Sequence, residues 1–254
     1  MVHFDVTTFA ESAPKTRSVE PPACGACAVR NRSLCSALSA AEVGELNRIA
    51  TRRQLNPGEL FAVEGDPSIA FANVISGVAK LVRGMEDGRE QIVGLLFPSD
   101  FVGRALSRSM GVAAVPYTVQ AATPLELCSF PAKGFEALLT RHPELEHKLL
   151  ERTLSELDSA RDWMLLLGRK SAAERVATFL HHIARRCATS GCKTGENFDL
   201  PLTRADMADF TGLTIETVSR QISRLRKDGI LAMEGNRHVV LVDMARLAER
   251  AGLN

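Results

Sequence analysis

The stretch LTRADMADFTGLTIETVSRQISRLRKDGIL at residues 202–231 restricts the possible folds more than any other part of the chain. Thr203 and Asp206 have the spacing of a helix N-terminal cap, and Gly212 can adopt the left-handed conformation that ends a short helix. Thr214 can then cap a second helix. Two short helices joined through such a turn are typical of a helix-turn-helix.

The second of these helices has four basic residues and one acidic residue between positions 216 and 227, which gives it a net charge of +3. Residues in the first turns of a recognition helix reach base edges, where arginine can donate two hydrogen bonds to guanine. A solvated helix with ordinary surface charges is the alternative, but it does not account for the turn and both caps. We therefore expect base contacts from Glu216, Ser219 and Arg220, and phosphate contacts from Arg224, Arg226 and Lys227.

Residues 230–242, ILAMEGNRHVVLV, read as two short strands around Gly235 and Asn236, which is the wing of a winged helix. The whole chain has a net charge of only +1, so a nucleic-acid footprint has to be local. The sequence therefore predicts binding of double-stranded DNA through a domain over residues 169–254.

A second feature is the crowding of Cys24, Cys27 and Cys35 in PPACGACAVRNRSLCSAL at residues 21–38. The segment follows a leader, residues 1–22, that is predicted to be flexible. The sequence has neither an apolar run long enough to span a membrane nor the apolar core of a secretory signal near its start, so we expect a cytoplasmic protein. In that reducing compartment, clustered cysteines more often bind metal or perform redox chemistry than form structural disulfides.

Short apolar runs broken by Gly, Pro and Asp continue from residue 52 to about 135, which predicts an antiparallel barrel or jelly roll. Asp87 and Gly88 between two of these runs indicate a hairpin. Ser39 and Glu42 form an S-x-x-E capping box that predicts a short helix before the strands. With the cysteine segment, these elements make a predicted sensor domain over residues 23–142.

Residues 143–168 are predicted to form one long helix, and its residues 150–167 have a heptad-like pattern. An apolar or small residue recurs there at spacings of three and four, which favours a parallel coiled-coil dimer over a helix packed only on its own barrel. Because threonine and alanine bury little apolar area, we expect the dimer to be weak. The predicted interface residues are Leu150, Thr153, Leu157, Ala160, Met164 and Leu167.

A β-barrel, a long dimer helix and a winged helix containing E-T-V-S-R at residues 216–220 together resemble the CRP/FNR superfamily of bacterial transcription regulators. The stretches EDGREQIVGLLFPSDFVG and LLLGRKSAAERVATFL have the same resemblance, which covers about residues 24–250. It implies an α+β fold in which the barrel senses a signal and a helix pair transmits it to two DNA-binding domains. It also implies a palindromic operator with TTGAT-like half-sites, and RNA polymerase as a partner.

The C-x2-C-x7-C spacing of Cys24, Cys27 and Cys35 resembles the ligand loop of the FNR branch, whose oxygen-responsive members carry an iron–sulfur cluster. A four-iron, four-sulfur (4Fe-4S) cluster needs four thiolates, and the resemblance assigns the fourth to Cys128 in LELCSF. Zinc suits the same four thiolates and is the main alternative metal.

The charged and remaining sulfur-containing residues have less specific interpretations. Arg30 and Arg32 either offset the negative charge of a thiolate-bound cluster or are ordinary exposed charges. Cys187 and Cys192 are expected to be structural or incidental thiols. The neighbouring His181 and His182 are expected at a helix surface and core rather than as metal ligands.

Three other functions are weighed against an oxygen sensor. A cyclic nucleotide is disfavoured because RALSRSMGVAAVPYTVQAAT at residues 104–123 lacks a phosphate-binding motif. A CRP/FNR-type regulator without a cluster, gated by thiol redox of the cysteines or by another small ligand, stays an alternative. An enzyme is disfavoured because residues 52–135 contain no histidine for a metal site of the cupin type.

Overall fold

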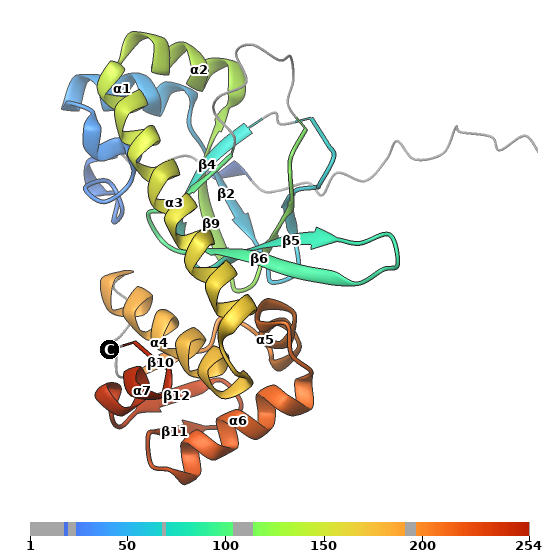
Figure 1. The fold of residues 1–254 in the computed structure, drawn as a ribbon. Coiled ribbons are helices and arrows are strands. Elements are labelled where there is room, and N and C mark those ends of the chain that lie inside the picture. The colour runs from blue at the N-terminus through green and yellow to red at the C-terminus, as the bar shows by residue number, and fades with distance from the viewer. Residues whose placement is uncertain (1–17, 20–23, 68–69, 104–113, 191–196, 254) are drawn as a thin grey trace, which may run out of the picture.

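The computed structural model describes residues 18–19, 24–67, 70–103, 114–190 and 197–253 (Figure 1). The helices are α1 (Ala40–Ile49), α2 (Ala132–Arg141), α3 (Pro143–Arg169), α4 (Ala172–Ser190), α5 (Arg204–Thr211), α6 (Ile215–Lys227) and α7 (Met244–Arg250). Two short 3-10 helices precede them, η1 (Cys24–Ala26) and η2 (Leu34–Ala37). The strands are β1 (Ser18–Val19), β2 (Thr51–Leu55), β3 (Leu60–Ala62), β4 (Ala70–Ser76), β5 (Ala79–Gly84), β6 (Glu90–Leu96), β7 (Phe101–Val102), β8 (Thr118–Ala121), β9 (Leu125–Pro131), β10 (Asn197–Asp199), β11 (Leu231–Glu234) and β12 (His238–Leu241).

Two antiparallel sheets form the N-terminal half, with strand orders β1-β2-β9-β4-β7 and β3-β8-β5-β6. They share a core of aliphatic side chains, among them Leu55 and Leu127 from the first sheet and Leu81 and Val119 from the second. The expected β-domain is thus confirmed. The predicted leader is partly different, because Ser18–Val19 pair with β2, while the rest of residues 1–22 lies outside the described residues.

A second core lies above the five-stranded sheet, where α1, α2 and the start of α3 meet. The cysteine loop, which we define as residues 24–38, inserts Leu34 and Leu38 into this core. Phe135 of α2 stacks on Phe130 of β9 at 5.6 Å between ring centroids, and Leu149 of α3 packs in the same cluster. The cysteine loop and the long helix therefore share one hydrophobic core.

The capping signals in the sequence operate as expected. Ser39 and Glu42 form a reciprocal capping box at the start of α1, and Asp87 and Gly88 lie in the turn between β5 and β6. The long helix begins at Pro143, where a missing N–H costs nothing, and it continues to Arg169, one residue beyond its predicted end.

The C-terminal domain packs directly on the outer face of the β5–β6 hairpin. Its core of α4, α5, α6 and the wing includes Val82 and Ile92 from that hairpin. Lys80 of β5 lies 2.5 Å from a carboxylate oxygen of Asp206 on α5, and both side chains are largely buried. The two halves are thus joined by an apolar interface as well as by the long helix.

Candidate cysteine site and DNA interface

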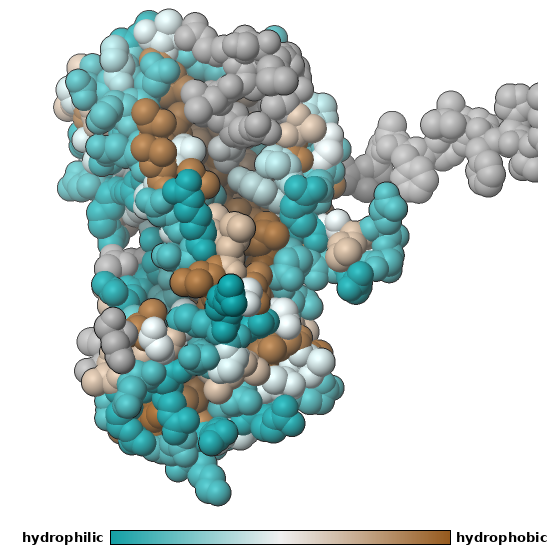
Figure 2. Space-filling model, viewed as in Figure 1, coloured by the Kyte–Doolittle hydropathy of each residue, from teal (hydrophilic) through white to brown (hydrophobic). Residues whose placement is uncertain are grey.

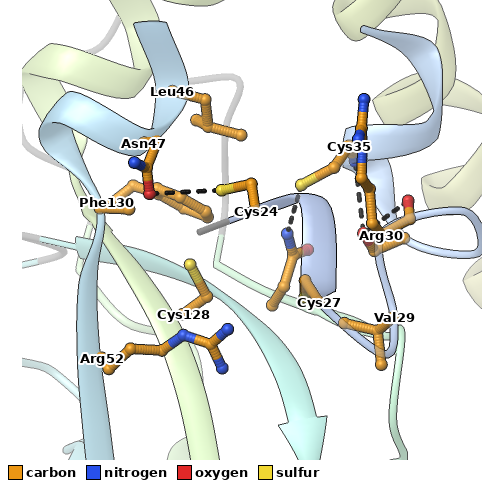
Figure 3. Close-up of a pocket in the computed structure, with 13 residues that line it drawn as sticks. Cys24, Cys27, Val29, Arg30, Cys35, Leu46, Asn47, Arg52, Cys128 and Phe130 are labelled. Carbon is orange, nitrogen blue, oxygen red and sulfur yellow. Dashed lines mark hydrogen bonds between the residues drawn. The ribbon is translucent and has the colours of Figure 1, made fainter. Parts of the chain in front are cut away.

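Four cysteine side chains line one pocket between the cysteine loop and the five-stranded sheet (Figure 3). Cys24 lies on η1 and Cys35 on η2, with Cys27 between them, whereas Cys128 lies on the inner strand β9. All four are half-buried free thiols. The structure therefore brings together the four residues that the sequence assigned to one site.

The pocket is organised by polar side chains from three other elements. The Cys24 thiol donates a hydrogen bond to Asn47 Oδ1 of α1 at 3.3 Å, and Asn73 Nδ2 of β4 donates to Cys35 Sγ at 3.6 Å. Within the sheet, Cys128 is paired with Arg52 on one side and with Asn73 on the other. A row of Arg52, Cys128 and Asn73 thus crosses the sheet beneath the loop.

Burial controls the protonation of these thiols. Removal from water raises the pKa of Cys128 to about 12, with a smaller contribution from the neighbouring Cys35. Burial also raises the pKa values of Cys24 and Cys35, while the positive charge of Arg52 opposes the rise at Cys24 and Cys128. These thiols are therefore protonated at neutral pH, and a bound metal would have to displace their protons.

The chemistry of the donor set fits a thiolate-bound metal group, but the pocket is narrow. Its volume of about 20 Å³ holds little more than one water molecule. Among the described residues, no three His, Cys, Asp or Glu side chains converge closely enough to hold a single metal ion. The thiols instead line the walls of a common cavity, three on the loop and one on the strand.

The arginines at this pocket differ in part from those expected. Arg30 lines the pocket, as one interpretation of the sequence predicts, whereas Arg32 contributes no lining side chain. Arg52 also lines it and has a side chain only 6% exposed. This role of Arg52 was not predicted, because a charged residue in TRRQL ordinarily faces solvent.

A direct contact joins the cysteine loop to the long helix. The Arg152 guanidinium of α3 donates a hydrogen bond to the carbonyl oxygen of Arg32, midway between Cys27 and Cys35. At the other end of α3, Arg175 donates to the carbonyls of Leu167 at 2.7 Å and Thr211 at 3.1 Å. The long helix therefore contacts the cysteine loop near its start and the helix-turn-helix near its end.

The predicted seam residues of α3 differ in exposure. Leu150, Leu157 and Met164 are exposed, and so are Leu154 and Leu165, which the heptad assignment omitted. Figure 2 shows apolar surface that follows this helix across the molecule. Thr153 and Ala160 are exposed at the edge of this face and line a groove against the β6 side of the same chain, and Leu167 is half-buried. The dimer interface itself stays a prediction.

The helix-turn-helix has the geometry that its sequence predicts. Thr203 and Asp206 form a capping box on α5, Gly212 ends that helix at a φ of 63°, and Thr214 caps α6. Val218 is fully buried under the crossing. The β11–β12 hairpin supplies the wing, and β10 adds a third strand that was not predicted. In Figure 1, α6 lies at the end of the molecule away from the two large sheets.

All six predicted DNA-contacting side chains are exposed on α6, namely Glu216, Ser219, Arg220, Arg224, Arg226 and Lys227. Their exposure contrasts with the buried face of the same helix, which packs Ile222 and Leu225 into the domain core. One side of α6 is thus held by the protein and the other is free to enter a groove.

Comparison with known proteins decides the family. Residues 52–142 match the model of the cyclic nucleotide-binding domain, and residues 174–250 match that of the Crp-like helix-turn-helix domain. The chain is 48% identical over 232 residues to the transcriptional activator protein FnrL of Cereibacter sphaeroides, covering 90% of this chain and 92% of that protein. The chain belongs to the CRP/FNR family of transcription regulators.

Other members of the family support the same assignment. This regulator is 37% identical to the nitrogen fixation regulation protein FixK of Bradyrhizobium diazoefficiens, over 92% of this chain and 97% of that one. The structure of FixK2 from Bradyrhizobium japonicum superposes with a TM-score of 0.71 at 33% identity, covering 79% of this chain and 96% of the other. The fold prediction is confirmed, and the enzyme alternative is excluded because members of the family are transcription factors.

Two further points concern ligands and membranes. Residues 104–113, half of the segment on which the expectation against a cyclic nucleotide depends, lie outside the described residues, so that expectation stays a prediction. Among the helices described, none is long and apolar enough to span a membrane.

Of the two other cysteines, Cys187 is buried in the core of the C-terminal domain, and Cys192 lies outside the described residues.

His182 of this CRP/FNR regulator is half-buried between α4 and α3. Its ring lies edge-on to Trp163 of α3 at 5.0 Å and to Phe97 at 6.2 Å. Burial, together with the nearby charge of Arg186, lowers the pKa of His182 to about 4. It is thus neutral at physiological pH and packs α4 against the long helix.

Base recognition by Arg220 can be separated from phosphate binding by Arg226. Arg220→Ala is expected to cost about 1–3 kcal/mol at the cognate operator and to relax the preference at one G·C pair. Arg226→Ala is expected to weaken all DNA sequences similarly and to flatten the salt dependence of binding. Fluorescence anisotropy with cognate and G-substituted duplexes at several salt concentrations measures both effects. Unchanged discrimination by Arg220→Ala would contradict the assignment.

Proposed function

We propose that this regulator responds to oxygen through a 4Fe-4S cluster bound by Cys24, Cys27, Cys35 and Cys128. The observation that carries the proposal is the common pocket formed by three thiols of a short loop and one thiol of an inner strand. Four thiolates are the ligand set of such a cluster, and the cluster supplies a centre that dioxygen can oxidise. Among relatives, the anaerobic regulatory protein of Pasteurella multocida is 30% identical over 230 residues.

The raised pKa values argue against the alternative in which the same cysteines act as thiol sensors. A reactive cysteine needs a thiolate at neutral pH, which exposed cationic surroundings supply. Burial here raises the pKa values of Cys24, Cys35 and Cys128 instead. Without a metal group, these thiols would be poor nucleophiles, so thiol sensing is the weaker proposal.

The cysteine loop connects the pocket to the long helix α3. Loop residues such as Cys24, Cys27 and Cys35 form one wall of the pocket, so we expect a group bound there to fix the position of the cysteine loop relative to β9. Leu34 and Leu38 anchor this loop in the core that also holds Leu145 and Leu149 of α3. A change in the position of the loop therefore reaches the base of the long helix through packed side chains.

On the DNA side, we propose that two chains pair along α3 and present two α6 helices to a palindromic operator with TTGAT-like half-sites. Family members act as dimers on DNA, and two recognition helices of a dimer meet successive major grooves about one turn apart. Activation would then proceed through RNA polymerase. Binding of the loop cysteines to the cluster favours the dimer, and their release favours the monomer.

The proposal is tested by purifying the protein without oxygen and measuring its visible absorption together with its iron, sulfide and zinc content. Four iron and four sulfide ions per chain are expected. Stoichiometric zinc without sulfide would show that the four cysteines form a structural zinc site, and it would overturn the oxygen-sensing function.

Arg152 provides a test of the coupling between loop and helix. Arg152→Ala is expected to keep the cluster but to lower the anaerobic dimer fraction, because the hydrogen bond to the Arg32 carbonyl is lost. Hydrogen bonds from charged groups contribute about 1.5–3 kcal/mol, which corresponds to a change of about 10-fold or more in dimer affinity. Analytical ultracentrifugation measures it, with Arg89→Ala, an exposed arginine between β5 and β6 and outside the proposed interface, as the control.

A further inference from the structure

Arg52 is a buried arginine whose side chain reaches the cysteine pocket (Figure 3). It lies on β2 directly opposite Cys128 in the pairing with β9. Its side chain is 6% exposed, and one guanidinium nitrogen lies 3.0 Å from Glu126 Oε1. A buried cation is thus held beside the thiols, in a pocket that Arg30 of the cysteine loop also lines.

A buried charge needs a compensating partner, and Glu126 is only a partial one. The Glu126 side chain is 30% exposed, so water as well as Arg52 stabilises its carboxylate. The ion pair alone would work equally well on the surface, where it would avoid the desolvation cost of the guanidinium. The position of Arg52 beside Cys128 therefore calls for a second role.

Strand β2 contains a second arginine that serves as a comparison for Arg52. Arg53, the next residue, faces the other side of the sheet, where its guanidinium lies 5.7 Å from the centre of the Phe61 ring. Arg53 is paired with Leu127 rather than with Cys128. Two consecutive arginines thus share a strand and a charge, but only Arg52 faces the thiols.

We propose that Arg52 is a positioning residue of the cysteine site, whose buried positive charge stabilises the anionic, thiolate-bound form of the four cysteines. This inference rests on the proposed function, because it requires that the cysteines bind a metal group as thiolates. Four thiolates leave such a group with net negative charge, and a cation fixed in a low-dielectric pocket offsets that charge better than an exposed one. Glu126 holds the guanidinium in place.

The experiment compares Arg52→Gln, Arg52→Lys and Arg53→Gln, each purified without oxygen in the full chain. The readout is the rate at which an excess of a ferrous-iron chelator removes iron, measured anaerobically, together with the thermal unfolding of each metal-free protein. Groups adjacent to metal ligands typically change metal affinity by about 10- to 100-fold. Arg52→Gln is expected to lose iron faster by a factor in that range, whereas Arg52→Lys and Arg53→Gln should stay within about threefold of wild type.

The outcomes separate the possible roles of Arg52. A variant Arg52→Gln that unfolds at lower temperature but retains iron like wild type would show a purely structural ion pair and overturn the inference. If Arg52→Gln does not fold, Glu126→Gln decides, because it removes the negative charge while its amide oxygen can still accept the hydrogen bond that holds Arg52. That variant should then retain iron at least as well as wild type, and faster loss would contradict the inference. A wild-type protein without iron and sulfide would instead refute the proposed function.

Discussion

Leu157→Glu is expected to leave the chain monomeric without oxygen and to weaken operator binding by more than about 100-fold. The leucine lies in the middle of the exposed apolar face of α3, between Leu150 and Met164. In a symmetric dimer each substitution counts twice. Loss of a leucine that the dimer would bury on both sides removes about 2–4 kcal/mol of apolar burial, and two glutamates would face each other across the seam.

Sedimentation and operator binding measure this effect directly. Leu60→Glu is the matched control, since it introduces the same charge at a comparably exposed leucine on β3, away from α3. The cluster absorption of both variants should equal that of wild type, because neither residue lines the cysteine pocket. A Leu157→Glu protein that remains a tight DNA-binding dimer would show that α3 is not the interface.

Cys128→Ser is expected to abolish the visible absorption of the cluster and to reduce iron and sulfide to background. Cys128 is the one thiol of the pocket on an inner strand, so no shift of the cysteine loop can replace it. A serine hydroxyl is a much weaker ligand for iron than a thiolate. Cys24→Ser, Cys27→Ser and Cys35→Ser should have the same consequence.

Cys187→Ser is the control for loss of a thiol elsewhere. Cys187 is buried in the core of the C-terminal domain and does not line the cysteine pocket. Its replacement should therefore leave the iron content, the sulfide content and the absorption unchanged. A Cys128→Ser protein with a fully assembled cluster would remove Cys128 from the ligand set.

Local signals in the sequence were sufficient for most individual elements. The capping box at Ser39, the hairpin at Asp87 and Gly88, and the turn at Gly212 all form as predicted. Each depends on residues within a few positions of one another, so no distant contact is needed to predict it. Helix α2 was missed because it follows β9 at once and begins without a side-chain cap.

The parts that could not be predicted depend on contacts between distant segments. Arg52 is buried in a pocket that the cysteine loop and α1 complete, and the strand pattern of TRRQL contains no sign of this. Arg152 contacts a carbonyl that precedes it by 120 residues. A backbone carbonyl carries no sequence signal at all.

The packing of the C-terminal domain on the β5–β6 hairpin could likewise not be predicted from the sequence. Val82 and Ile92 alternate as ordinary strand residues, yet their side chains complete the core of the C-terminal domain rather than that of their own sheets. The exposed face of α3 was only partly predicted. A strict heptad includes Thr153 and omits Leu154, although both residues fit a helical spacing. The structure shows that Leu154 is exposed together with the other leucines of this face.

In the proposed mechanism, the state of the four cysteines determines whether two chains pair on DNA. The most direct measurement follows one anaerobic sample, bound to a duplex with two inverted TTGAT half-sites, while air is admitted. We predict that cluster absorption, dimer fraction by sedimentation and operator binding decline together. Loss of the absorption with an unchanged dimer and unchanged DNA binding would contradict the account.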